Sequence, residues 1–388
     1  MAAPSSCASF DEAYLASWWQ LLRTPGVFRN PLYSMTQRRP LAGQAAGAIT
    51  QFNEEHLKNK RPSGLPRAAA DLRVVRGFDP ALFNFTRAAP SEVLLRVALV
   101  EGDASAPPRV LWSAASGGAP LVLQPGEREH LLLANISPIL GAHGLLVPAC
   151  HECLPQVLTT PALITALRVM ALAERPDFHL GFNSLAAWAS VNHLHFHATY
   201  IADAFPADGR FAVERATTMR LACVSLPAHV AVGWSLQVEE LSGWPLGGFK
   251  FGLLAPALTP DGGAAAARAV GAGPPPPLAA AALGAAAGAL VACMVAGDCA
   301  HNLLLADRGA TVFVLPRAHQ AGGGADDGRM AVAFAETCGI GIVYSQSVYD
   351  SFSAAEYDSA LAGAAISGDL RDALREAALV GVRTQGAQ

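Results

Sequence analysis

The sequence predicts an α+β fold in which an antiparallel sheet carries flanking helices. Two observations support this class: several short segments alternate apolar and polar residues, and single helical segments separate them without a repeated strand–helix–strand rhythm. The chain has 388 residues, of which 52% are hydrophobic, so it can bury one large core or two modest ones. We therefore expect a sheet of antiparallel strands with helices near both ends of the chain.

The first half of the chain begins with a helix and continues mainly with strands. Apolar residues at helical spacing over Phe10–Leu22, closed by Thr24-Pro25-Gly26, predict this first helix. The later expected elements are a strand at 92–100 followed by a loop at 102–108, strands at 130–134 and 144–148 around a turn at 135–142, a helix at 161–174, and a hairpin with strands at 178–182 and 189–201.

The second half contains a stretch at 260–290 that is rich in Ala, Gly and Pro. The tract from Leu278 to Met294 is interrupted by Gly284 and Gly288, and Ala and Gly contribute little to membrane insertion. We interpret the stretch as a flexible or loosely helical insert and expect no membrane span. The remaining expected elements are a strand region covering 298–304 and 311–317, a polar loop at 322–328, and helices at 353–361 and 370–379.

These elements suggest one organisation for the whole chain. Its expected parts are an N-terminal helical segment (1–30), a region carrying the principal site (31–205), a continuation of the sheet (206–259), the Ala/Gly/Pro-rich insert (260–290) and a C-terminal half packed on the same core (291–388). Two related sheet halves in one chain would fit this layout, and we expect a monomer or a homodimer.

Charge and cysteine content limit the partners and the compartment. The net charge is −4, so the sequence offers no polyanion-binding surface and we expect no nucleic-acid partner. Met1 to Leu15 lacks a basic region followed by an apolar one, and seven cysteines are an odd number. We therefore expect a cytoplasmic protein in a reducing compartment, without a membrane partner.

The most informative segment is Asn192–Tyr200, where His193, His195 and His197 alternate with apolar residues. On a strand, all three imidazoles would project from one side, with successive rings roughly 6–7 Å apart. The segment holds three of the 11 histidines within five residues, which is difficult to explain as an ordinary polar strand face. This spacing predicts a site for one phosphate group or one ion.

The chemistry of imidazole favours His195 as a nucleophile toward phosphorus. A neutral ring nitrogen can attack, provided that a flanking histidine or a backbone carbonyl fixes the other nitrogen. His193 and His197 would then bind the phosphate, and one of them or a nearby group would protonate the leaving oxygen. The Ser190 hydroxyl is a further candidate for phosphate binding, although an ordinary strand serine is an equal interpretation.

A metal site is the competing hypothesis for the same residues. Three imidazoles can hold zinc or iron, and Cys150-His151-Glu152-Cys153 supplies half of a structural zinc site. The chain has no second Cys-x-x-Cys pair, and the zinc-deaminase pattern also fails. We expect no metal and no cofactor, and a structural role for the two cysteines.

The segment from His193 to Thr199 resembles the histidine-triad superfamily of nucleotidyl hydrolases and transferases. Gly181–Leu185 with Ala189–His195 is similar to the catalytic block of the GDP-D-glucose phosphorylase and GDP-L-galactose phosphorylase family. Further similar blocks are Gln51-Phe52-Asn53, Lys60-Arg61-Pro62, Phe78-Asp79-Pro80, Phe83–Thr86, Asn135–Pro138, His143–Pro148, Ala300–Leu303 and Glu336–Gly339. Together these blocks span most of the chain.

The resemblance implies a histidine-triad-like sheet and guanylyl transfer from a GDP-hexose. His195 would attack the α-phosphorus and release hexose 1-phosphate, and inorganic phosphate would then convert the GMP–His195 intermediate to GDP. The motif offers Asn183, Ser190, His193 and His197 as groups that meet the charge of the transition state. Lys60 and Arg61 could neutralise the second phosphate or the incoming one, although a solvated basic turn explains them equally well.

Two departures from the family pattern concern single residues. Ala142 stands where family members usually have glycine, so a positive φ there would strain the backbone. His197 resembles the animal enzymes, since the plant GDP-L-galactose enzymes carry glutamine at this position. Neither the preferred hexose nor the residues that recognise guanine can be assigned.

Three other functions remain open on the same sequence. A histidine-triad hydrolase would use water in place of phosphate as the acceptor. A nucleotide-binding regulator would retain the fold without catalysis, and a three-histidine metalloenzyme would carry out different chemistry. Dependence of turnover on phosphate, tight nucleotide binding without turnover, and sensitivity to chelation would distinguish these three functions from the phosphorylase.

Overall fold

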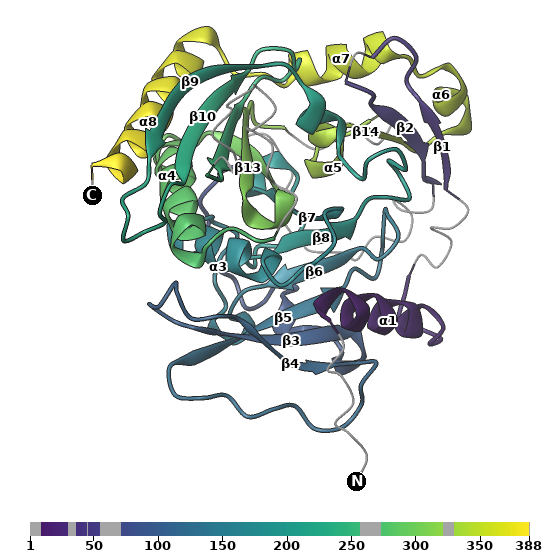
Figure 1. The fold of residues 1–388 in the computed structure, drawn as a ribbon. Coiled ribbons are helices and arrows are strands. Elements are labelled where there is room, and N and C mark those ends of the chain that lie inside the picture. Colours follow the sequence, from purple (N-terminus) through teal and green to yellow (C-terminus); the bar gives the residue numbers. More distant parts are fainter. Residues whose placement is uncertain are drawn as a thin grey trace.

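A sheet of eleven strands forms the centre of the molecule (Figure 1). The computed structural model describes residues 9–29, 36–44, 46–54, 71–256, 273–320 and 330–387. The strand order is β4-β3-β5-β6-β8-β7-β12-β13-β11-β10-β9, and each neighbouring pair is antiparallel. The predicted α+β class with an antiparallel sheet is therefore confirmed.

The first half of the chain contributes one side of this sheet. Helix α1 spans Phe10–Leu22, as predicted, and begins with a capping box between Ser9 and Glu12. The other elements are β3 (Val93–Val100), β4 (Arg109–Ser113), β5 (Glu127–Ala134), β6 (Gly144–Val147), α3 (Thr160–Met170), β7 (Phe178–Asn183) and β8 (Phe196–Tyr200).

The second half contributes the other side. Strand β13 (Thr311–Arg317) has the predicted bounds, and β12 (Ala300–Ala306) is close to its prediction. The remaining large-sheet elements and helices of this half are β9 (Thr218–Ser225), β10 (Ser235–Leu241), β11 (Phe249–Leu254), α4 (Pro277–Ala296), α7 (Ala354–Gly363) and α8 (Gly368–Gly386).

A three-stranded sheet joins segments from opposite ends of the chain. Strand β2 (Ile49–Phe52) pairs antiparallel with β1 (Gln37–Pro40) and parallel with β14 (Ile340–Val343). Helices α5 (Phe334–Cys338) and α6 (Gln346–Ser351) flank β14 in the sequence. The sequence did not predict this small sheet, because its strands are only four residues long.

Two apolar clusters cover the two faces of the large sheet. One cluster joins α1, α3, α4 and α8 to Phe178, Leu180 and Phe182 of β7. The other joins the three-stranded sheet and α5 to Leu304 and Leu315 of β12 and β13. His179, Gly181 and Asn183 alternate with the first set of β7 residues, so they point toward the second cluster.

The Ala-rich stretch after residue 276 is a core helix rather than a flexible insert. Ala is the best helix former, and Pro277 occupies a position in the first turn where proline is tolerated. Gly284 and Gly288 let α4 approach α3 closely, since a Cβ at Gly284 would lie 2.7 Å from Ile164 Cγ1. The helical alternative for residues 277–290 therefore agrees with the structure, whereas a flexible insert is wrong there; residues 257–272 lie outside the described ranges.

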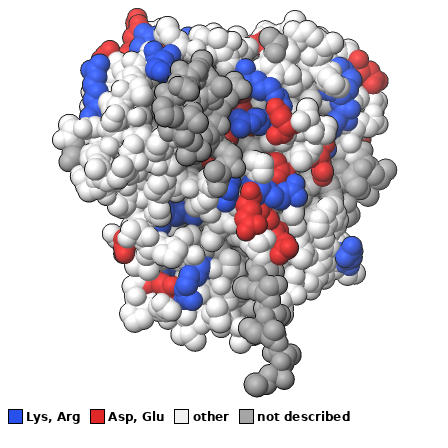
Figure 2. Space-filling view, viewed as in Figure 1, with Lys and Arg blue, Asp and Glu red and all other residues white. Residues whose placement is uncertain are grey.

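Helix α4 is also long and apolar enough to cross a membrane by length and composition. In the fold, 61% of its most apolar window is buried, against α3, α8 and the sheet. Figure 2 shows one face of the molecule, on which the acidic and basic side chains of the described residues are intermixed among many other residues. Among the described residues of that face, neither sign of charge forms a continuous stripe.

Candidate functional site

The histidine segment only partly adopts the predicted strand. Strand β8 begins at Phe196, so His193 and His195 lie in an irregular segment after the short helix η6 (Leu185–Ala187). The reason is a tertiary contact: the Leu194 N–H donates to the Leu154 carbonyl, and the His195 N–H donates to the Gln156 side chain at 2.8 Å. The prediction of a strand over 189–201 is therefore wrong for its first seven residues.

The rings nevertheless form one continuous cluster. The ring centres of His195 and His197 are 5.7 Å apart, close to the expected spacing. His193 and His195 both contact the ring of Phe85, at 5.6 and 5.0 Å between centres. The site thus contains the three histidines that the sequence pattern singled out.

The His195 ring is held in one tautomer by a backbone carbonyl. Its Nδ1 lies 2.8 Å from the carbonyl oxygen of His193, and because a carbonyl only accepts, Nδ1 carries the proton. The lone pair of the neutral ring is therefore on Nε2. Gln156 fixes the backbone here, since its Nε2 donates to the carbonyls of His195 (3.1 Å) and Asn183 (2.9 Å).

His193 is a buried and neutral ring. Its side chain is fully buried, and its Nδ1 accepts a hydrogen bond from the Phe85 N–H at 3.0 Å. Burial lowers the pKa of His193 to about 4, although the Cys150 carbonyl opposes the shift. At neutral pH this residue therefore adds no charge to the site, while its own carbonyl orients His195.

His197 is held at both edges of its ring. Its Nδ1 lies 3.0 Å from His143 Nε2, and its Nε2 lies 3.1 Å from Asn183 Nδ2. The amide of Asn183 is in turn fixed by Asn302, whose Nδ2 donates to Asn183 Oδ1 at 2.5 Å. Asn302 belongs to β12, so the site lies where β7 pairs with β12 and the two halves of the sheet meet.

Helix α1 supports the turn that carries His143. The indole N–H of Trp18 donates to the His143 carbonyl, and the Tyr14 hydroxyl donates to the Ala142 carbonyl, each at 3.0 Å. Gly144 makes this approach possible, because a Cβ there would overlap the Tyr14 hydroxyl. Burial raises the pKa of Tyr14 well above its usual range, so the hydroxyl remains a donor.

The structure gives less information on the other predicted site residues. Ser190 is half-buried in the segment between η6 and His193, and no hydrogen bond from its hydroxyl to the described residues is present. Lys60 and Arg61 lie outside the described residues. Their proposed contacts with phosphate therefore stay predictions.

The cysteine pair flanks a short turn beside His193. Cys150 and Cys153 are both free thiols at the ends of the 3-10 helix Cys150–Glu152, and burial raises the pKa of Cys150 to about 11. Across the described residues, no group of three or more His, Cys, Asp or Glu side chains is arranged to hold a metal ion. The thiol form of Cys150 packs with Phe85 and Val147.

Sequence reasoning assigned no role to His143, Gln156 or Phe334, which contact the histidines or their backbone. It also assigned no role to Asn302, which holds the Asn183 amide beside His197. His143 and Asn302 lie in blocks that resemble the family, so the resemblance contained a signal for them. Gln156 and Phe334 make tertiary contacts that no local sequence pattern predicts.

The fold and the site define an α+β protein with a histidine cluster at the seam of one sheet. Two family models, described as the GDPGP1-like N-terminal domain and the GDPGP1-like C-terminal domain, match residues 9–199 and 213–377. The chain belongs to this GDPGP1-like family.

Curated relatives carry phosphorylase names. The chain is 33% identical to GDP-L-galactose phosphorylase 2 of Arabidopsis thaliana over 56% of its length and 46% of the relative, and 34% identical to GDP-D-glucose phosphorylase 1 of Homo sapiens over 51% and 45%. The chain therefore spans about half the length of the curated relatives it matches. The crystal structure of yeast Ap4A phosphorylase Apa2 aligns with 93% of this chain and 96% of that chain, at 13% identity and a TM-score of 0.45.

Proposed function

We propose that the protein is a GDP-hexose phosphorylase that transfers a guanylyl group through His195. The hydrogen bond from His195 Nδ1 to the His193 carbonyl carries this proposal, because it leaves the nucleophilic lone pair on Nε2. Membership of the GDPGP1-like family and the names of the relatives support the substrate class. The small-molecule substrates would be GDP-D-glucose or GDP-L-galactose and inorganic phosphate.

The reaction has two displacements at the same phosphorus atom. In the first, Nε2 of His195 bonds to the α-phosphorus, the bond from that phosphorus to the bridging oxygen breaks, and hexose 1-phosphate leaves. In the second, an oxygen of inorganic phosphate attacks the α-phosphorus, the N–P bond breaks, and GDP leaves with His195 restored. Both transition states place negative charge on the phosphoryl oxygens, which fixed donors must meet.

The neighbouring residues have separate roles in this proposal. The amide of Asn183 and the hydroxyl of Ser190 would donate to phosphoryl oxygens. When the Asn183 amide turns from Nε2 of His197 to the substrate, a protonated Nε2 would supply the proton that the leaving oxygen takes. His193 would bind phosphate only as a neutral donor, since its pKa is lowered to about 4. Lys60 and Arg61 would neutralise the second phosphate.

Product analysis with a nucleophile variant tests the proposal. Purified protein is incubated with GDP-D-glucose and with GDP-L-galactose, each with and without inorganic phosphate, alongside His195→Asn and the exposed control His229→Asn. We expect GDP and continuous release of hexose 1-phosphate only with phosphate, a loss of at least about 1,000-fold in His195→Asn, and no change in the control.

Substrate labelled at the α-phosphorus adds a direct test of the intermediate. Without phosphate, the parent protein should retain acid-labile label and release one equivalent of hexose 1-phosphate, whereas His195→Asn should retain none. Continuous formation of GMP without phosphate would instead identify a hydrolase that uses water as acceptor. Absence of any turnover with either sugar nucleotide would refute both activities.

A further inference from the structure

We propose that Phe334, supplied by the C-terminal half, is a positioning residue that holds the ring of His197 in its reactive orientation. The expected effect on the reaction rate rests on the proposed function. The contact between Phe334 and His197 does not depend on which substrate the protein binds. Phe334 is the first residue of α5 and is only 2% exposed. It lies outside the histidine segment and outside the N-terminal family domain.

The two rings are stacked in a nearly parallel arrangement. Their centres are 5.8 Å apart and their planes differ by 13°. This is the offset-stacked geometry that aromatic rings prefer. The hydrogen bonds to His143 and Asn183 fix the two edges of the His197 ring, and Phe334 covers one of its faces. Together these contacts oppose both rotation and tilting of the imidazole.

Gly181 makes this stacking possible. It lies directly opposite His197 in the pairing of β7 with β8, and on the same face of the sheet. A Cβ at Gly181 would overlap three ring carbons of Phe334, namely Cδ2, Cε2 and Cζ. A glycine at this point of a buried strand therefore serves the close approach of the Phe334 ring, since its backbone angles require no glycine.

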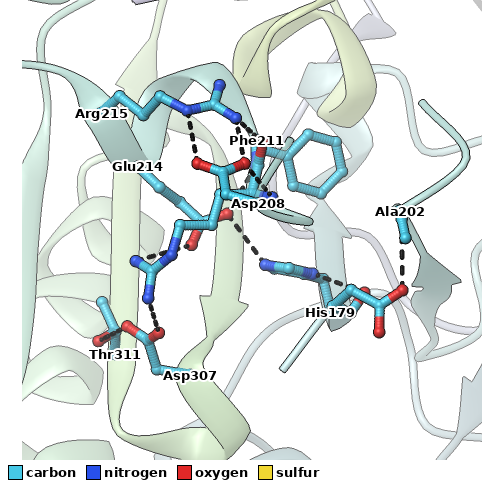
Figure 3. Close-up of polar contacts among 10 residues, drawn as sticks. His179, Ala202, Asp208, Phe211, Glu214, Arg215, Asp307 and Thr311 are labelled. Atoms are coloured by element: carbon cyan, nitrogen blue, oxygen red, sulfur yellow. Dashed lines mark hydrogen bonds and ion pairs between the residues drawn. The ribbon is translucent and has the colours of Figure 1, made fainter. Parts of the chain in front are cut away.

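A second aromatic residue, Phe211, supports Phe334 and is itself held by a buried polar pair. Phe211 packs edge-to-face on Phe334 at 5.6 Å, and its own N–H donates to Glu214 at 2.7 Å. Glu214 also pairs with His179 Nε2 at 2.9 Å, and the His179 ring packs on Phe211 at 5.2 Å (Figure 3). Strand β7 thus helps to place Phe334 in two ways: His179 packs on Phe211, which supports the Phe334 ring, and Gly181 leaves space for that ring.

A displaced His197 would lower the rate rather than substrate affinity. Proton donation to the leaving oxygen requires a hydrogen-bonded geometry, and a misplacement of about 1 Å can lower a rate by about 100-fold. In the proposed function His197 acts on the leaving oxygen, so we do not expect nucleotide binding to depend on that geometry. Loss of Phe334 should therefore appear in kcat and leave KM nearly unchanged.

Kinetics of matched variants test this role. Phe334→Leu is compared with Phe313→Leu, a buried phenylalanine of the same apolar cluster that does not contact the histidines, and with Gly181→Ala, which should displace the Phe334 ring. We expect kcat to fall roughly 10- to 100-fold in Phe334→Leu and Gly181→Ala, with KM within about two-fold and Phe313→Leu near the parent.

A double-mutant cycle separates positioning from general stability. Phe334→Leu added to His197→Gln should cost less than about two-fold, because the ring that it orients is gone. Losses that simply multiply, or an equal loss of kcat in Phe313→Leu, would overturn the proposal. Thermal unfolding of each variant shows whether the proteins remain folded at the assay temperature.

A second measurement does not depend on catalysis. The proton between His143 and His197 should exchange slowly with water and give an imidazole N–H signal in the NMR spectrum, assigned by its absence in His143→Gln. We expect this signal in the parent and in Phe313→Leu and its loss in Phe334→Leu; persistence in Phe334→Leu would refute the positioning role. If the parent lacks turnover, the proposed function fails while this spectrum still decides the role of Phe334.

Discussion

Ala142 adopts a left-handed backbone conformation, with φ 52°, directly before His143. The resemblance to the family implied a glycine at this position, and the positive φ is a conformation that favours glycine. A residue with a Cβ loses about 1 kcal/mol or more in this conformation. The strain lies in the turn that presents His143 to His197, and the Tyr14 hydroxyl bonds to the carbonyl of Ala142.

Replacing this residue with glycine should relieve the strain. We expect Ala142→Gly to raise the free energy of unfolding by up to about 1 kcal/mol, measured by urea denaturation. Ala134→Gly is the control, because Ala134 is equally buried in β5 but has no positive φ; it should lose about 0.5–1 kcal/mol. Equal losses in the two variants would show that Ala142 is not strained.

At the residue scale, the sequence predicted the group of three histidines but not its surroundings. The spacing of His193, His195 and His197 is a local pattern, and a backbone carbonyl was one of the two partners expected for the His195 ring. Gln156 and Asn302 lie 39 and 119 residues from their hydrogen-bond partners His195 and Asn183. Contacts of this range depend on the pairing of strands, which composition and periodicity do not specify.

At the element scale, helix α4 shows how glycine can support a helix rather than end it. Helices α3, α4 and α8 pack at short distances because small residues line the contacts of α4 with the other two. Gly381 of α8 faces a backbone atom, since a Cβ there would lie 2.6 Å from the backbone oxygen of Ala286 in α4. The Ala- and Gly-rich stretch alone allowed a flexible or loosely helical insert, because its packing partner α8 follows it by about 70 residues.

Gly381→Ala should therefore destabilise the protein although alanine is the better helix former. We expect a loss of about 1–3 kcal/mol in the free energy of unfolding, because a backbone oxygen cannot move aside. Gly368→Ala is the matched control in the same helix, where nothing lies within 4 Å of a new Cβ, and it should be neutral or slightly stabilising. Equal effects of the two substitutions would contradict the close packing of α4 and α8.

At the scale of the whole molecule, the fold buries several histidines in neutral form. Burial lowers the pKa values of His130, His193 and His301 to about 4 each. His179 differs: burial acts to lower its pKa, but the carboxylate of Glu214 raises it above the usual value. These groups are distributed over β5, β7, the triad segment and β12, so the effect belongs to the entire sheet.

Stability should consequently fall as the pH falls from about 6.5 to 4. In this window the unfolded chain binds protons at the three histidines whose pKa is lowered by folding, and the folded protein does not. Each of them therefore lowers the free energy of unfolding by up to about 3 kcal/mol as the pH falls to 4. His179 has the opposite sign, because its contribution is present below pH 6.5 and lost above its raised pKa. Urea denaturation at several pH values in this range gives the free energy of unfolding as a function of pH. This free energy should fall less steeply with falling pH in His301→Gln than in the parent, and as steeply as in the parent in the exposed control His229→Gln.

The seam between β7 and β12 affects how the protein can be made and degraded. A fragment that ends near residue 205 would keep all three triad histidines, yet it would lack Asn302 and Phe334 and expose the free edge of β7. An uncovered strand edge is a template for pairing with other chains. Truncation or proteolytic cleavage between the halves should therefore produce an aggregating fragment rather than a slower enzyme, so that the two halves must be synthesised, folded and removed together.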